Sequence, residues 1–244
     1  NRNFEIVNGD FRDNEFFFEK EPDPTNDFSL FYRNDGLGLS SSNTGFFLLF
    51  KQGKLNFAEF NYETPIQNRN EDITVQNINE TDVFVQEITT TGAVINKWTK
   101  IPNTIGQTLN YNSQSLGTRN LYSVENIDND GIRIKYPDGS FGNVPTGIYR
   151  VWYRVSDGER YTIQPDDATN ITVSIPYQNG NGEDHRLSLT FGLESSVGNS
   201  LPAESLASIK QRAPQTFYTQ NRMVSAQDYQ VFPLSQTSNI LKLK

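Results

Sequence analysis

Apolar and polar residues alternate along most of the chain up to about residue 190, the pattern of strands with one buried face. The alternation is clearest in Ile148–Val155, which reads IYRVWYRV. Turn-forming Asn, Asp, Gly and Pro residues separate the runs. The pattern predicts antiparallel hairpins and a meander, and thus a mainly β fold of the α+β class. Further strands are expected at residues 46–50, 55–62, 79–88, 94–98, 132–136, 168–177 and 187–191.

The periodicity changes near the C-terminal end. Between Ser200 and Pro214 apolar residues recur at spacings of three and four, which predicts a helix of about three turns. Ser200 is expected to cap it and Pro214 to end it, because the residue before a proline disfavours the α region. Ser225 and Asp228 have capping-box spacing and predict a second, shorter helix that ends before Pro233. We therefore expect a helix–linker–helix connector, with QTFYTQNRM as an extended linker.

A loop-rich stretch at residues 105–118 separates two β-rich regions, since Gly, Asn, Ser, Gln and Thr are concentrated there. We expect an N-terminal β-rich part at residues 1–105 and a β-meander domain at 118–199. The helical connector at 200–244 is expected to lead into a truncated C-terminal part. The sequence starts without Met or a signal peptide and stops on a strand-like pattern, so both ends are expected to be cut from a longer protein.

Composition narrows the classes of function. The 244 residues carry a net charge of -8 without a cluster of Lys and Arg, so no nucleic-acid partner is expected. No cysteine is present, which excludes disulfides and thiolate chemistry. No apolar run reaches the roughly 18–20 residues that span a bilayer, so no membrane partner is expected. Aromatic residues, at 12%, are too frequent for a disordered tail.

Residues that could carry catalysis or bind a metal are few. His185 is the only histidine, lies in a predicted polar loop and has no G-x-S-x-G partner, which argues against a Ser–His–Asp site. Asn126, Asp128 and Asp130 offer oxygen ligands but lack the downstream Glu of an EF-hand loop, so a hairpin turn is the better interpretation. We predict no catalytic residue, no metal site and no cofactor.

Two segments place glycine, proline and polar residues at defined spacings. The first, IRIKYPDGSFGNVPTGIYRVWYRVSDG, sets a loop between two strands. Its glycines permit a positive φ or a close backbone approach, and its proline stiffens the loop. The second reads ESLxxIKxxAP and then TQNRxV[ST]xxDY. The residues singled out are Asp138, Gly139, Gly142, Pro145, Gly147 and Tyr153 in the first, and Pro214, Asn221, Arg222, Ser225, Asp228 and Tyr229 in the second.

Both motifs, in this order, resemble the baseplate wedge subunits of T4-like contractile-tailed phages and the wider baseplate J-like family. The resemblance covers residues 120–233 and, loosely, 55–98. Two departures are that Tyr136–Pro137 replaces the usual Phe–Gly and that no glycine-rich insert follows Gly158. The resemblance implies a structural, non-enzymatic subunit of the virion tail baseplate, assembled in the host cytoplasm. Its implied partners are other wedge subunits and copies of itself in the ring, whose rearrangement is transmitted to sheath contraction.

Arg222 lies in an aromatic, otherwise uncharged linker and is expected to bind a carboxylate or helix carbonyls, which would lock the linker. Two other classes of function stay open. An all-β glycan-binding tail or secreted module would fit the aromatic, acidic and hairpin-rich character, with Trp98 and Trp152 as candidate sugar platforms. A glycoside-active enzyme would use two carboxylates that sequence spacing does not locate.

Overall fold

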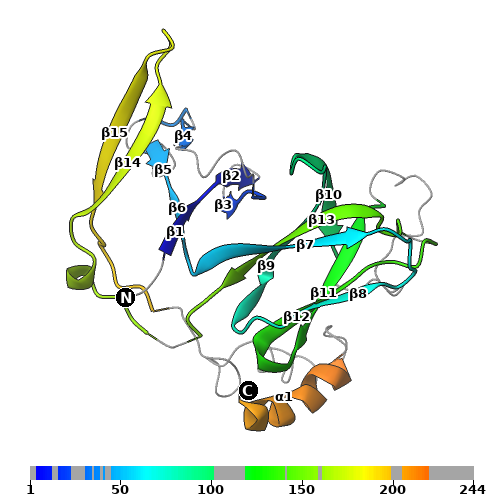
Figure 1. Cartoon of the computed structure of the whole chain (residues 1–244). Coiled ribbons are helices and arrows are strands. Elements are labelled where there is room, and N and C mark those ends of the chain that lie inside the picture. The colour runs from blue at the N-terminus through cyan, green and yellow to red at the C-terminus, as the bar shows by residue number, and fades with distance from the viewer. Residues whose placement is uncertain are drawn as a thin grey trace. The chain divides into compact units, whose positions relative to one another are not determined.

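The computed structural model describes residues 4–12, 16–22, 31–34, 36–38, 41, 45–101, 119–140, 142–158, 161–198 and 205–219. The chain divides into two compact units, Asn1–Asp157 and Gly158–Lys244. Within the described residues the fold is mainly β with antiparallel sheets, and there is one α-helix (Figure 1). The prediction of a mainly β fold is confirmed.

The centre of the first unit is a seven-stranded sheet. All its neighbouring strands are antiparallel except β10 and β11, which pair in parallel. The strands predicted from alternation in this part of the chain are confirmed, with their ends shifted by a few residues. The strands lie in the order β7 (Lys54–Tyr62), β13 (Gly147–Val155), β9 (Ile78–Ile88), β10 (Val94–Lys100), β11 (Leu121–Ile127), β12 (Gly131–Lys135) and β8 (Asn70–Ile73).

The expected domain boundary at residues 105–118 does not divide this sheet. Residues 102–118 lie outside the described part of the chain, but β10 precedes them and β11 follows them, and these two strands pair through Thr99–Lys100 and Leu121–Tyr122. The loop composition therefore marks a long connection within one sheet, and the structure places the division after Asp157.

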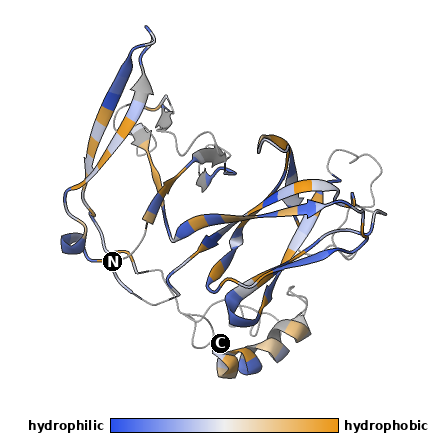
Figure 2. Ribbon diagram, viewed as in Figure 1, coloured by the Kyte–Doolittle hydropathy of each residue, from blue (hydrophilic) through white to orange (hydrophobic). Residues whose placement is uncertain are grey.

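The alternation sorts the side chains of the sheet into two faces. On the inner face Val151 of β13 lies between Ala58 of β7 and Val85 of β9. On the outer face Trp152 lies between Phe57 and Phe84. Figure 2 shows hydrophobic and hydrophilic residues alternating along these strands. The inner face is the core because its residues are buried, whereas Phe57 on the outer face is 52% exposed.

Four aromatic rings fill one end of the core: Tyr62, Trp98, Tyr136 and Tyr149. Neighbouring ring centroids lie 5.0–6.0 Å apart, mostly in edge-to-face or tilted arrangements that suit the ring quadrupoles. Burial raises the pKa of the Tyr62, Tyr136 and Tyr149 hydroxyls above their ordinary value. The rings come from β7, β10, β13 and the residue after β12. Their packing therefore connects strands that are not neighbours in the sheet.

Short antiparallel pairs precede the large sheet in the same unit. β1 (Phe4–Val7) pairs with β6 (Leu49–Gln52), and β2 (Gly9–Arg12) pairs with β3 (Phe16–Glu19). β4 (Phe31–Arg33) pairs with β5 (Gly45–Phe47). The predicted strand at 46–50 is thus divided between β5 and β6.

The second unit contains a hairpin of β14 (Ile171–Gln178) and β15 (Asp184–Phe191). Facing pairs alternate in character, because Val173 opposes Leu189 on one face and Ser174 opposes Ser188 on the other. This confirms the strands predicted at 168–177 and 187–191. A short 3-10 helix, Pro165–Asp167, precedes the hairpin.

The helix α1 (Leu206–Thr219) differs from the predicted helix at both ends. Ser205 caps it by accepting a hydrogen bond from the Ser208 N–H at 3.3 Å, whereas the expected cap Ser200 lies outside the described residues. Pro214 lies inside α1 and does not end it. A proline lacks one N–H but leaves the donors of later residues intact, so it biases a helix toward ending without enforcing it.

The predicted second helix, from Ser225, lies outside the described residues, so the helix–linker–helix arrangement remains a prediction. No helix in the described part of the chain is long and apolar enough to cross a membrane.

Candidate functional site

The first predicted motif forms the connection between β12 and β13. Asp138 accepts a hydrogen bond from the Ser140 N–H through Oδ1 at 2.8 Å, which closes a tight Asx-type turn. Gly139 has a φ of 96°, in the left-handed region that favours glycine. The Arg119 guanidinium donates to the Gly139 carbonyl at 3.1 Å, and the Arg119 carbonyl accepts from the Asn143 N–H at 2.7 Å. The loop is therefore held by the residues that precede β11.

Gly142 and Pro145 are fixed by packing. A Cβ atom on Gly142 would lie 2.4 Å from Cγ of Pro137, closer than non-bonded carbons approach. Pro145 is among the fully buried side chains of the unit. Gly147 opens β13 with a φ of 99°, and Tyr153 lies on the core face of that strand opposite Val83. The six residues thus act together in one strand–loop–strand unit whose shape depends on them.

The residues of the second predicted motif are brought together only in part. Pro214 lies in α1. Asn221, Arg222, Ser225, Asp228 and Tyr229 lie outside the described residues, so the predicted contacts of Arg222 stay a prediction.

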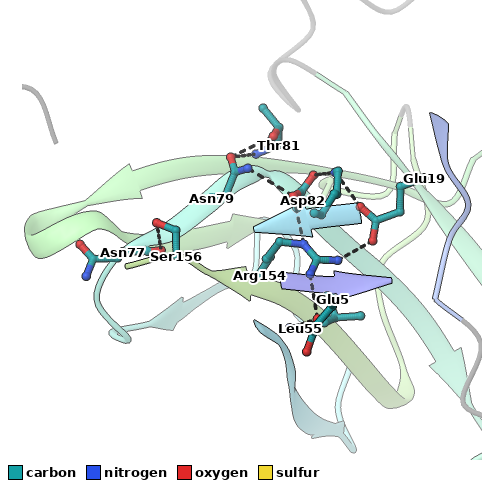
Figure 3. Close-up of polar contacts among 10 residues, drawn as sticks. Glu5, Glu19, Leu55, Asn77, Asn79, Thr81, Asp82, Arg154 and Ser156 are labelled. Carbon is teal, nitrogen blue, oxygen red and sulfur yellow. Dashed lines mark hydrogen bonds and ion pairs between the residues drawn. The ribbon is translucent and has the colours of Figure 1, made fainter. Parts of the chain in front are cut away.

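A cluster of five charged side chains connects the short N-terminal strands to the large sheet (Figure 3). We call it the latch; it consists of Glu5, Glu19, Lys51, Asp82 and Arg154. The Arg154 side chain is 1% exposed. Its Nη1 donates to Glu5 Oε2 at 2.8 Å and its Nη2 to Glu19 Oε1 at 2.6 Å. Its Nε lies 3.3 Å from Asp82 Oδ2. Lys51 Nζ lies 2.6 Å from both Glu19 and Asp82.

Each member of the latch comes from a different strand: β1, β3, β6, β9 and β13. Glu19 and Asp82 are nearly as buried as Arg154, with side chains 6% and 8% exposed. Buried ions lose their hydration, and removing one partner leaves the others uncompensated, at a cost of about 3–5 kcal/mol. The latch therefore makes the position of the N-terminal strands depend on β13.

Residues 19–22, which we call the strap, add contacts on the outer face of the sheet. The fully buried Gln86 donates through Nε2 to the Pro22 carbonyl at 2.7 Å and accepts from Trp152 Nε1 at 2.8 Å. Glu21 pairs with Lys97 at 3.2 Å. A buried amide whose oxygen and nitrogen are both bonded has a defined orientation. The strap is thus fixed to β9, β10 and β13 by specific polar bonds.

Two aromatic rings and an ion pair between the largely buried Arg150 and Glu59 lie together elsewhere on this outer face. The Phe57 and Trp152 rings are 5.1 Å apart, and the Arg150 guanidinium carbon lies 5.0 Å from the Phe57 ring centre. Glu59 Oε1 accepts from Arg150 Nε at 2.9 Å and Nη2 at 2.8 Å. The partly exposed rings and the fixed guanidinium form a small platform of defined shape, which we call the platform.

The latch is not predictable from the sequence pattern. Arg154 stands at a polar position of an alternating strand, where an arginine is expected to be exposed, so the sequence carried no signal of its burial. Its partners could not be named, since Glu5 and Glu19 lie 149 and 135 positions away along the chain.

The residues considered for chemistry occupy turns or strand ends. Asp128–Asp130 form a 3-10 turn between β11 and β12, which confirms the expected hairpin turn. His185 lies in β15 and not in a loop, with Nε2 3.6 Å from Glu183 Oε2. Among the described residues, no group of three His, Cys, Asp or Glu has an arrangement that could hold a metal ion.

The connection between β12 and β13, which we call the motif loop, joins the large sheet and the latch in one unit. The protein is mainly antiparallel β, and its N-terminal strands are fixed to a seven-stranded sheet by buried ion pairs. The chain belongs to the DUF8360 family, described as a domain of unknown function, which matches residues 1–196. This range includes the latch, the motif loop and the β14–β15 hairpin, and it ends before α1. No curated protein and no solved structure matches the chain.

Proposed function

We propose that the chain is part of a baseplate wedge subunit of a contractile phage tail. In this role it assembles with other wedge subunits and with copies of itself into the ring around the hub. It carries no catalytic activity, and it transmits the rearrangement of the ring to sheath contraction. The proposal places it in the virion, after assembly in the host cytoplasm.

The motif loop between β12 and β13 carries the proposal. The resemblance to wedge proteins depends on Asp138, Gly139, Gly142, Pro145 and Gly147. Each of these residues has a local physical reason for its identity: a turn bond, a positive φ, a close approach or burial. The resemblance to wedge proteins therefore involves residues that together shape one loop. A chance match of glycines and prolines would not be expected to have this property.

The latch supports the mechanical part of the proposal. A subunit that transmits movement must keep its strands together under load, and the latch joins five strands through ion pairs on one guanidinium and one ammonium. The predicted helix–linker–helix connector completes the proposed subunit, with α1 as its first helix.

The test is co-expression of the full reading frame with its neighbouring genes, followed by co-purification and mass determination by light scattering. The expected result is a stable hetero-complex with a defined subunit ratio. The same neighbours expressed without the chain are the control, because they must not form that complex alone. If the chain purifies as a monomer that binds none of the co-expressed proteins, the wedge function is rejected.

A second candidate function, glycan binding, is favoured by the platform. The exposed Phe57 ring, packed against the Trp152 ring at 5.1 Å, offers an apolar surface of the kind that packs on the face of a sugar ring. A glycan array with the intact chain tests it, and Phe57→Ala should abolish any binding, because Phe57 is the exposed ring of the platform. Ile95→Ala, at another exposed apolar position, is the matched control.

A further inference from the structure

The loop between β14 and β15 contains two Asn–Gly sequences, Asn179–Gly180 and Asn181–Gly182, and a third, Asn8–Gly9, connects β1 to β2. An asparagine followed by glycine is prone to deamidation, because glycine has no side chain to hinder the attack of its backbone nitrogen on the asparagine side chain. Whether this attack occurs depends on how freely the side chain and the nitrogen can move. The three sequences are therefore compared by the contacts that hold each of them.

Asn179 is held at both ends of its amide group. Its Oδ1 accepts hydrogen bonds from the Asn181 N–H at 2.9 Å and from the Glu183 N–H at 3.0 Å. Its Nδ2 donates to Glu183 Oε2 at 2.8 Å and lies 3.1 Å from His185 Nε2. The attack on Asn179 must first break these contacts, so the folded hairpin protects this residue.

Asn8 is protected by burial and by the strands on either side of it. The residue is 9% exposed, and its carbonyl accepts a hydrogen bond from the Lys20 N–H at 2.7 Å. Val7 is paired with Leu49 in one sheet, and Gly9 is paired with Glu19 in another. These pairings restrict the backbone rotation that would bring the Gly9 nitrogen onto the side chain of Asn8.

Asn181 lacks both kinds of protection. It is exposed, and its side chain forms no hydrogen bond with any residue that the structure describes. Gly180 and Gly182 are exposed as well, and a Cβ atom on either would meet no described heavy atom within 4 Å apart from its chain neighbours. One contact opposes the reaction, because the Gly182 N–H donates to the Asn179 carbonyl at 3.0 Å. This single bond costs less to break than the contacts on the Asn179 amide.

We propose that Asn181 is a self-modification site, at which the hairpin tip converts its asparagine into aspartate and isoaspartate. The Gly182 nitrogen loses its proton to hydroxide and bonds to Cγ of Asn181. The Cγ–Nδ2 bond breaks, and Nδ2 takes up a proton and leaves as ammonia. One water molecule then opens the succinimide at either carbonyl. The product has a carboxylate at position 181, near Glu183 and Asp184 in the sequence, so the tip gains one negative charge.

Mass spectrometry of the intact chain after incubation at mildly alkaline pH tests the proposal. Trypsin cuts after Arg160 and Arg186 and releases Asn179 and Asn181 on one peptide, whose fragmentation distinguishes the two positions. Asn8 is released on a separate peptide, so the three sites are measured in one sample. Deamidation replaces an amide NH2 by OH and is read as the corresponding gain in mass. Asn181 should deamidate roughly tenfold or more faster than Asn179 and Asn8 in the folded chain.

The chain unfolded in guanidinium chloride is the control. There all three Asn–Gly sequences lose their contacts, so they should deamidate at similar rates. If Asn179 or Asn8 reacts as fast as Asn181 in the folded chain, the proposal is overturned. It is overturned as well if Asn181 stays unmodified in the folded chain under conditions that modify the unfolded one.

A variant tests why Asn179 is protected. Glu183→Ala removes the carboxylate that binds Nδ2, and it should raise the deamidation rate of Asn179 several-fold while the rate of Asn8 stays unchanged. Glu194→Ala, at an exposed position outside the loop, is the matched control and should leave both rates unchanged. An unchanged rate of Asn179 in Glu183→Ala would contradict the proposed protection. The proposal does not rest on the wedge function, because the reaction needs no partner.

Discussion

At the scale of single residues, contact with Pro137 explains why position 142 is occupied by glycine. Its backbone approaches Pro137 so closely that no side chain fits, and the carbonyl of Arg119 lies 3.2 Å from the position of a Cβ. The loop before β13 therefore depends on a hydrogen atom at this position, because any larger group must displace either the proline ring or the residues before β11.

Gly142→Ala is expected to lower the free energy of unfolding of the first unit by about 1–3 kcal/mol, the usual cost of overpacking. Urea unfolding followed by tryptophan fluorescence measures it, since both tryptophans, Trp98 and Trp152, belong to that unit. Ser140→Ala in the same loop is the control, because it keeps the N–H that donates to Asp138 and should change stability little. An unchanged midpoint for Gly142→Ala would contradict the close approach.

Arg154→Met should destabilise the first unit by about 3–5 kcal/mol, because it leaves the buried carboxylates of Glu19 and Asp82 with Lys51 alone. The measurement is the same unfolding experiment, together with limited proteolysis of the N-terminal strands. Arg133→Met is the matched control: Arg133 forms an exposed pair with Asp72, whose pKa it holds below the ordinary value, and little change is expected. Equal effects of the two changes would argue against the latch.

At the scale of elements, α1 contains its own weak point. Pro214 cannot donate a hydrogen bond to the carbonyl four residues earlier, and its ring crowds that turn. Pro214 therefore interrupts the backbone hydrogen bonding of α1 between an eight-residue segment, Leu206–Ala213, and a five-residue segment, Gln215–Thr219.

Pro214→Ala is expected to raise the helix content of the chain and to strengthen α1 by as much as about 3 kcal/mol, the difference between the two residues inside a helix. Circular dichroism and hydrogen exchange of the α1 amides measure the effect. Gln211→Ala, at an exposed position of the same helix, should change far less. A loss of helix content in Pro214→Ala would show that the proline is needed where it stands.

At the scale of the whole molecule, four buried tyrosines are expected to make the free energy of unfolding decrease at alkaline pH. Burial raises the pKa of Tyr62, Tyr122, Tyr136 and Tyr149 above 10, whereas unfolding restores the ordinary value near 10. Above that pH the unfolded chain binds fewer protons than the folded chain, so stability is kept below pH 10 and decreases as the pH rises further.

A pH titration followed by tyrosinate absorbance should accordingly show these four tyrosines ionising together with unfolding, and the exposed ones ionising earlier. Tyr62→Phe removes one of the four groups and should make the alkaline loss of stability less steep. If all 11 tyrosines of the chain ionise in one transition near pH 10 while the fold persists, the buried assignment is wrong.

The sequence predicted what depends on neighbours along the chain. Alternation located β7, β9, β13 and the β14–β15 hairpin, and the spacing of glycines located the loop before β13. The parallel pairing of β10 with β11 could not be predicted, because it joins strands across a long connection whose composition is that of a domain boundary. The latch was missed for the same reason, since an acidic residue in a short strand gives no sign of a partner in a distant one.

The separation between Glu5 and Arg154 also has a consequence for synthesis. A ribosome adds roughly 5–20 residues per second, so about 7–30 s separate the appearance of these two residues, which lie 149 positions apart. Throughout that interval Glu5 and Glu19 lack Arg154, the buried cation to which both bind in the folded chain. The strands made first are therefore fixed last, and a nascent chain that stalls before β13 leaves its N-terminal strands open to proteases and to neighbouring chains.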